Sequence, residues 1–159
     1  MVNSLVLLVS LICAAPLEAR VPNNANGICY WSCVDSVLGT NLVNVVMSTG
    51  IGRDDGADGK SIDVLFEAFE IRKLTALTVA GAESQVKANR PVIAICQPWT
   101  LAETCHAIVL LDVRTVRVSR RSYQKQVIYF DPNYPSQNRV MSWSVFATKY
   151  RVGHILEKK

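Results

Sequence analysis

The first half of the chain carries apolar residues at helical spacing. They recur from residue 29 to about residue 47 and predict one long amphipathic helix, although Gly39 and Asn41 weaken its middle. Residues 50–59, rich in glycine and aspartate, are typical of a loop. A second amphipathic helix is predicted over residues 61–71. This segment begins with a serine and an aspartate, and apolar residues follow at helical spacing.

The second half of the chain is dominated by short apolar runs of strand length. The strand candidates are residues 92–96, 105–113, 126–130 and 152–156. The run at 105–113 is almost continuously apolar, which is typical of a strand buried on both faces of a sheet. Residues 142–150 predict a short helix before the last strand. Helices first and strands second indicate an α+β fold.

Length and composition are those of one ordinary globular domain. The chain has 159 residues, of which 50% are hydrophobic and 19% charged, and this argues against a disordered or low-complexity protein. Five cysteines are too few for a miniature scaffold held together by disulfides. The formal net charge of +4 is modest, so the charge alone does not call for nucleic acid or an anionic membrane as a partner.

The N-terminal residues 1–19 have the pattern of a secretory signal peptide. The apolar run from Ser4 to Leu17 is shorter than the ~17–25 residues of a membrane span, and small residues precede a cleavage point after Ala19. The alternative is a buried strand or helix at the edge of the fold. We therefore expect residues 20–159 to form a single domain without a stable membrane span. It is secreted or periplasmic if the signal is cleaved, and cytoplasmic otherwise.

Cys29 lies where the first predicted helix begins, in the sequence NGICYWSC. Unpaired N–H groups and the positive end of the helix dipole stabilise an anion at such a position, which lowers the pKa of a thiol and makes it more nucleophilic. Cys33 lies one turn further along the same helical face, where this effect has faded. Cys29 is therefore the candidate nucleophile. The structural alternative is that both cysteines are small buried apolar residues.

A histidine and an aspartate lie at the ends of two predicted strands. His106 opens one apolar strand, and Asp131 directly follows the strand that ends at Phe130. A general base must be held rigidly near the thiol, and a carboxylate from a neighbouring strand can fix the orientation of its imidazole. His154 is the competing histidine, but no acidic residue is placed to orient it. We therefore hypothesise a triad of Cys29, His106 and Asp131.

Four short motifs, taken in order, resemble those of the papain-like cysteine peptidases. They are CYWSC at 29–33, RPVIAI at 90–95, CHAIVLL at 105–111 and IYFDP at 128–132. The likeness is strongest to the bacterial branch related to the double-glycine leader peptidases, and it runs from about Asn23 to Tyr150. The resemblance implies a papain-like fold, in which N-terminal helices carry the nucleophile and pack on a C-terminal antiparallel β-sheet. It also implies a peptide or protein substrate.

Carried over residue by residue, the resemblance makes Cys29 the nucleophile, His106 the general base and acid, and Asp131 the orienting residue. A Gln of the family, which donates to the oxyanion, is replaced by Asn23 in this chain. The Asn amide donates in the same way but is one methylene shorter. Either Asn23 or a neighbour such as Asn24 reaches the oxyanion, or the oxyanion hole is incomplete. The implied reaction is hydrolysis of a peptide or isopeptide bond through a thioester acyl-enzyme.

Three other uses of these residues remain open. Cys29, Cys33, Cys105 and His106 have the ligand types of a zinc site, although their spacing lacks the tight pairs of structural zinc sites. A Cys-His-Asp triad also serves acyltransferases and transglutaminases, in which the acyl acceptor is not water. A non-catalytic papain-like binding domain follows if Asn23 does not complete the oxyanion hole. We expect a monomer that needs neither a cofactor nor a metal.

A basic stretch separates the strand candidates at 105–113 and 126–130. Its members are Arg114, Arg117, Arg120, Arg121 and Lys125. Valines interleave with the first of these residues. Charge in this pattern normally lies on a solvated hairpin, which is our prediction for this stretch. Binding of an acidic substrate or of nucleic acid is the alternative.

Overall fold

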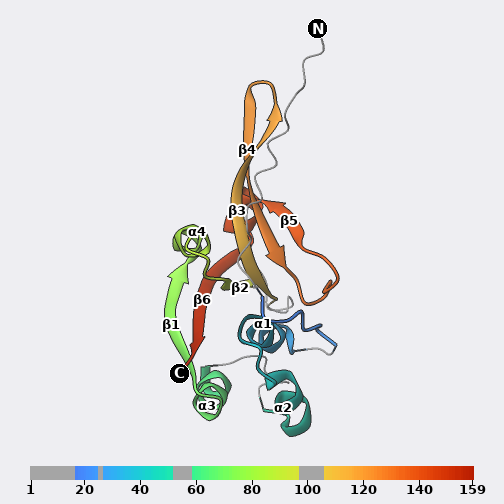
Figure 1. The fold of residues 1–159 in the computed structure, drawn as a ribbon, viewed down its shortest axis with the longest axis vertical. Coiled ribbons are helices and arrows are strands. Elements are labelled where there is room, and N and C mark those ends of the chain that lie inside the picture. Colours follow the sequence, from blue (N-terminus) through green and yellow to red (C-terminus); the bar gives the residue numbers. More distant parts are fainter. Residues whose placement is uncertain (1–16, 25–26, 52–58, 97–105) are drawn as a thin grey trace.

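The computed structural model describes residues 17–24, 27–51, 59–96 and 106–159. Within these ranges the chain forms five α-helices and six β-strands (Figure 1). The helices are α1 (Cys29–Leu38), α2 (Leu42–Thr49), α3 (Gly59–Ala68), α4 (Val79–Lys87) and α5 (Trp143–Lys149). The strands are β1 (Ile71–Thr78), β2 (Val92–Cys96), β3 (Ala107–Ser119), β4 (Ser122–Phe130), β5 (Arg139–Ser142) and β6 (Tyr150–Lys158). The predicted α+β class is confirmed.

The six strands form one sheet with the order β1-β6-β2-β3-β4-β5, and every neighbouring pair is antiparallel. β3 and β4 form a long hairpin, and β6 returns across the sheet to lie between β1 and β2 (Figure 1). The expected order of helices first and strands second is only partly right, because β1 precedes α4. Both halves of the chain therefore contribute to the sheet. The short helix predicted before the last strand is confirmed as α5.

Helices cover both faces of this sheet. On one face, Trp31 of α1 and Phe66 of α3 belong to the same buried core as Val109 of β3. On the other face, Phe146 of α5 shares a second core with Leu110. Adjacent residues of β3 thus enter opposite cores. The prediction that the apolar run at 105–113 is buried on both faces is confirmed for residues 107–113, and Cys105 lies outside the described residues.

The single helix predicted over residues 29–47 is wrong, because the segment forms two helices. α1 ends at Leu38, and Gly39 follows with a left-handed backbone (φ 60°) that favours glycine. Its N–H donates to the carbonyl oxygen of Asp35 at 2.8 Å. A Cβ at Gly39 would lie 3.3 Å from the Cβ of Glu18, so close packing also favours the smallest residue here.

The buried carboxylate of Asp35 holds the start of α2. It accepts hydrogen bonds from the backbone N–H groups of Leu42 and Val43, both at 2.9 Å, and from the hydroxyl of Thr40. The N-cap residue of α2, Asn41, makes no side-chain capping bond. A side chain from the preceding helix therefore satisfies donors that a helix N-terminus leaves unpaired.

Replacing Asp35 by alanine should destabilise the protein by about 3 kcal/mol, because two backbone N–H groups at the start of α2 lose their acceptor. Urea unfolding followed by circular dichroism measures this change. The exposed Asp63 of α3 provides the control, since Asp63→Ala should stay within about 0.5 kcal/mol of the parent. An equal effect of the two substitutions would contradict the capping role of Asp35.

Two strands were not predicted from the sequence, β1 and β5, and both lie at the edges of the sheet. The pattern predicted Ile71 as an apolar position of the second helix, yet it opens β1. α3 ends at Ala68, and Glu70, with a φ of 53°, turns the chain into the strand. β1 is defined by pairing with a distant segment, β6, and local periodicity carries no record of such a partner. β5 pairs with the preceding strand β4, but it has only four residues, too few for a clear alternating pattern.

Candidate functional site

Three elements meet at one end of the β3–β4 hairpin and carry the three residues of the hypothesised triad. Cys29 is the first residue of α1, His106 directly precedes β3, and Asp131 directly follows β4. Pairing of Val109 with Phe130 aligns the two strand ends. Both of these residues belong to the core that α1 packs against, which fixes the helix beside the hairpin. The structure therefore brings together residues that are distant in the sequence.

His106 and Asp131 are joined by a hydrogen bond of 2.9 Å between Nε2 and Oδ1. The same carboxylate oxygen accepts the backbone N–H of Asn133 at 2.9 Å. Burial opposes ionisation of Asp131, but these bonds and the charge of His106 outweigh it and lower the pKa of the carboxyl. Asp131 is therefore a fixed, ionised acceptor. Because Nε2 is engaged, Nδ1 is the ring nitrogen left for the thiol of Cys29.

Cys29 and His106 favour each other's charged forms. Burial raises the pKa of the Cys29 thiol, but hydrogen bonds with His106 and with the backbone of Ala107 outweigh burial, and the net pKa lies below its usual value of 9.0. Burial likewise disfavours the imidazolium. Asp131 and Cys29 nevertheless raise the pKa of His106 to about 9. Each group therefore shifts the other toward its charged form, a thiolate beside an imidazolium.

Asn23, the predicted oxyanion donor, lies against the loop that follows Asp131. Its backbone N–H donates to the carbonyl oxygen of Pro132 at 2.8 Å, and its side-chain Nδ2 donates to Oδ1 of Asn133 at 2.6 Å. Its own Oδ1 is buried and has no hydrogen-bond partner among the described residues. One amide hydrogen is thus committed to Asn133, and the second is left for another acceptor. Asn24, the alternative donor, is exposed.

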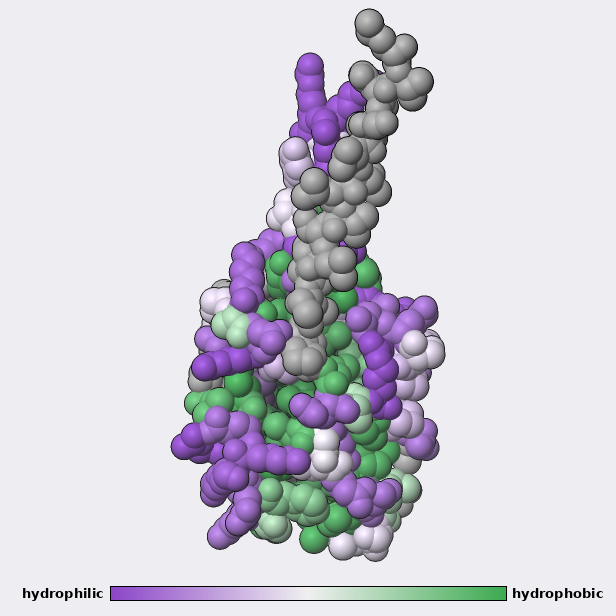
Figure 2. All heavy atoms as spheres, viewed as in Figure 1, coloured by the Kyte–Doolittle hydropathy of each residue, from purple (hydrophilic) through white to green (hydrophobic). Residues whose placement is uncertain are grey.

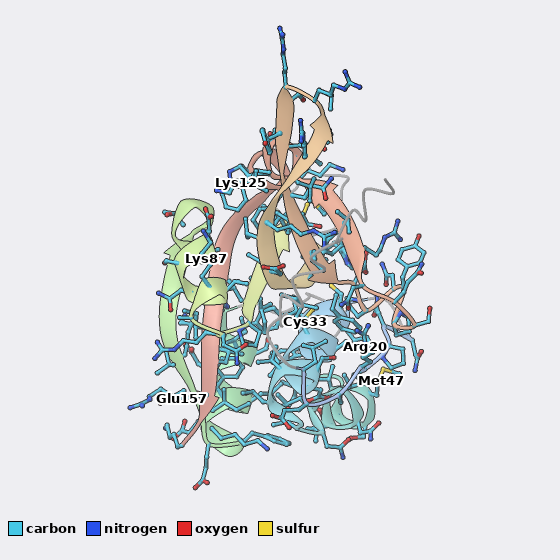
Figure 3. All side chains as sticks on the ribbon, turned by 45° about the horizontal axis from the view of Figure 1, so that its top comes forward. Arg20, Cys33, Met47, Lys87, Lys125 and Glu157 are labelled. Atoms are coloured by element: carbon cyan, nitrogen blue, oxygen red, sulfur yellow. The ribbon has the colours of Figure 1, made fainter. Side chains whose placement is uncertain are left out.

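The segment of residues 17–24 runs between α1 and the loop after β4. Val21 donates its backbone N–H to Oγ of Ser36 at 3.0 Å, which fixes the segment to α1. Arg20, labelled in Figure 3, donates to Oδ1 of Asn138 at 2.6 Å, which fixes the segment to the loop. These contacts, together with the Asn23–Asn133 bond, were not predicted from the sequence. The only local signal was the Asp-Pro-Asn sequence, which is typical of a turn.

Cys33 and His154, the competing cysteine and histidine, are part of the buried interior. Cys33 is fully buried beneath the sheet (Figure 3), and burial raises the pKa of its thiol. His154 lies on β6, where its Nδ1 is 2.8 Å from the hydroxyl of Tyr30. Burial, with a smaller contribution from Lys73, lowers the pKa of His154. Both groups are therefore held in their uncharged forms.

The zinc hypothesis gains no support from the described part of the chain. Within it, no group of three or more His, Cys, Asp or Glu side chains is arranged to hold a metal ion. Cys105, one of the four ligands considered, lies outside the described residues. Cys33 faces the protein interior, and His106 is already bonded to Asp131.

Comparison with protein-family models and with curated proteins found no match to this chain. Among the helices within the described ranges, none has the length and apolar character needed to cross a membrane. The predicted signal peptide lies largely outside these ranges, since only Leu17, Glu18 and Ala19 of it are described. The chemistry of the site is therefore the basis on which function is inferred.

Proposed function

We propose that the protein is a thiol hydrolase that cleaves peptide or isopeptide bonds, with Cys29 as nucleophile, His106 as general base and acid, and Asp131 as orienting residue. The observation that carries this proposal is the ordered contact of the three groups. Asp131 holds Nε2 of His106 at 2.9 Å, and a hydrogen bond between His106 and Cys29 lowers the pKa of the thiol. A papain-like arrangement of the fold and secretion after removal of residues 1–19 belong to the same proposal.

In the proposed reaction the Cys29 thiolate attacks the scissile carbonyl carbon and forms a tetrahedral intermediate. His106, protonated at that point, transfers its proton to the leaving amine as the C–N bond breaks, and an acyl thioester remains on Cys29. A water molecule then attacks the thioester while neutral His106 accepts its proton. Collapse of the second intermediate releases the acid and regenerates the thiolate–imidazolium pair. Asp131 orients the imidazole in both halves.

Two groups would donate to the oxyanion of these intermediates. One is the backbone N–H of Cys29, the first residue of α1. The second amide hydrogen of Asn23 is the other donor. Removing one such donor typically lowers turnover by ~10²–10³. A chain that relies on Asn23 therefore depends on the bond with Asn133, which sets the direction of its amide.

An activated ester such as p-nitrophenyl acetate tests the proposal without knowledge of the natural substrate. We expect a burst of nitrophenolate and one acetyl group on Cys29, identified by mass spectrometry of the digested protein. Acylation of Cys29 should disappear in Cys29→Ala and persist in the matched control Cys33→Ala. Because the pKa of Cys29 is lowered and that of Cys33 is raised, Cys29 should react at least about tenfold faster.

The fate of the acyl group separates the alternatives. Release of acetate to water supports a hydrolase, whereas transfer that requires an added amine such as glycinamide would favour an acyltransferase. A binding domain would show neither a burst nor selective acylation of Cys29. Equal acylation of Cys29 and Cys33 would contradict the proposed nucleophile.

A further inference from the structure

The β3–β4 hairpin concentrates positive charge on a projecting arm. Between residues 107 and 130, the basic residues are Arg114, Arg117, Arg120, Arg121 and Lys125, and the only acidic residue is Asp112. Asp112 is buried near the base, whereas residues 117–124 are all exposed. The arm extends beyond the body of the molecule (Figure 1), and its end is strongly hydrophilic (Figure 2). The prediction of a solvated hairpin is confirmed, and the strands extend through the basic stretch.

The positive charge of the distal β3–β4 arm, residues 112–125, is largely uncompensated within the described residues. Lys125 is paired with Glu83 of α4. Arg117 donates to the backbone carbonyl oxygens of Ser119 and Arg120, which hold its guanidinium at the tip without neutralising it. No carboxylate pairs with Arg120 or Arg121 among the described side chains. An acidic partner would therefore find several unneutralised guanidinium groups on one arm.

The distal arm also offers strand edges. β2 pairs with β3 only along residues 107–110, and β5 pairs with β4 only along 126–129. Within the described residues, the outer edges of 112–119 and 122–125 thus have no neighbouring strand. Unpaired N–H and C=O groups on a strand edge recognise another polypeptide backbone, which adds as a further strand. Edge recognition of this kind favours a polypeptide over a nucleic acid or a membrane.

We propose that the distal β3–β4 arm, residues 112–125, is a docking site for an extended, acidic segment of a polypeptide substrate. That the docked polypeptide is a substrate rests on the proposed function. The arm is continuous with the site, because β3 starts after His106 and β4 ends before Asp131. A strand of the length of β3 spans roughly 40 Å. A docked chain is thus tethered within reach of Cys29, which raises the local concentration of its scissile bond.

Binding can be tested apart from catalysis in the Cys29→Ala protein. The probe is a fluorescein-labelled peptide of about twelve residues that alternates glutamate and threonine, long enough to cover the distal edge. Fluorescence anisotropy gives its Kd. The arm variant carries three substitutions, Arg117→Ser, Arg120→Ser and Arg121→Ser, and we expect its Kd to be about tenfold higher or more, since three exposed ion pairs with the peptide are lost. The control variant loses the same charge at other exposed positions through Lys60→Ser, Arg90→Ser and Lys158→Ser. Its Kd should stay within about twofold of the Kd of the Cys29→Ala protein.

A second pair of probes tests recognition of the backbone. A peptide N-methylated at alternate residues keeps its charge but loses edge hydrogen bonds, and we expect it to bind at least about tenfold more weakly. The proposal is overturned if the arm variant binds like the charge-matched control, or if the N-methylated peptide binds as well as the parent. It is also overturned if oligothymidylate or phosphatidylserine vesicles bind more tightly than the peptide through the same arginines. Peptide binding without acylation of Cys29 would retain docking and reject the hydrolase.

Discussion

His106→Ala should trap the protein as an acyl-enzyme. After acetylation of Cys29 by excess p-nitrophenyl acetate and removal of the reagent, the acetyl group should be lost about 10²–10⁴-fold more slowly than in the parent. The reason is that deacylation needs a base to take a proton from the attacking water, and His106 is the group bonded to both Asp131 and Cys29. Intact-mass spectra recorded over time measure the loss.

The second histidine provides the control for this experiment. His154→Gln removes an imidazole from the buried interior but keeps a polar partner for the hydroxyl of Tyr30. In the His154→Gln protein, acetyl-Cys29 should be hydrolysed at a rate within about threefold of the parent rate, because His154 bonds to Tyr30 rather than to His106 or Asp131. If His154→Gln traps the acyl-enzyme and His106→Ala does not, the general base has been misassigned.

Asp131→Ala should lower turnover of the ester by about 10²-fold or more, since the imidazole loses the carboxylate that orients it. The substitution should also lower the alkaline limit, that is, the pH above which activity is lost. Of the influences that raise the pKa of His106, the hydrogen bond with Asp131 is the largest, and in the parent that pKa is about 9. The imidazolium is lost as pH rises through this value. Without Asp131 the loss should come at lower pH.

Asp131→Asn separates geometry from charge. The amide oxygen can still accept from Nε2 of His106, so orientation is retained while the negative charge is lost. We expect turnover between those of the parent and Asp131→Ala, with an alkaline limit below that of the parent. Profiles of pH against rate between about pH 6 and pH 10 give both quantities. An unchanged alkaline limit in Asp131→Ala would show that the carboxylate does not support the charged imidazole.

Cys29 and Cys33 show how strongly position within one helix controls a thiol. Both belong to α1, one turn apart, and burial raises the pKa of each. At Cys29 the hydrogen bonds with His106 and the backbone of Ala107 outweigh burial. At Cys33 no hydrogen bond from the described residues lowers the pKa, and the nearby charges of Cys29 and Asp131 raise it further. The proposed thiolate at Cys29 thus makes a second thiolate at Cys33 less favourable.

The sequence predicted those parts of the site that have local signals. A cysteine where a helix begins, a histidine before an apolar strand and an aspartate after another strand are each visible in a short window. Asn133 was not identified, because its bond with Asn23 joins residues far apart in the chain. The division of the first helix was missed for a related reason. Gly39 hinted at it, but the carboxylate of Asp35 that starts α2 is recognisable only in three dimensions.

The pH dependence of Cys29 alkylation by iodoacetamide is the most direct test of the thiolate–imidazolium pair. The reagent is uncharged, so its rate follows the fraction of thiolate. In the parent, the alkylation rate should reach half of its maximum at a pH below 9.0, the midpoint, because the contact with His106 lowers the pKa of the thiol. In His106→Ala the midpoint should rise, since burial then acts without the opposing imidazolium. Identical midpoints in the two proteins would contradict the ion pair and the catalytic role built on it.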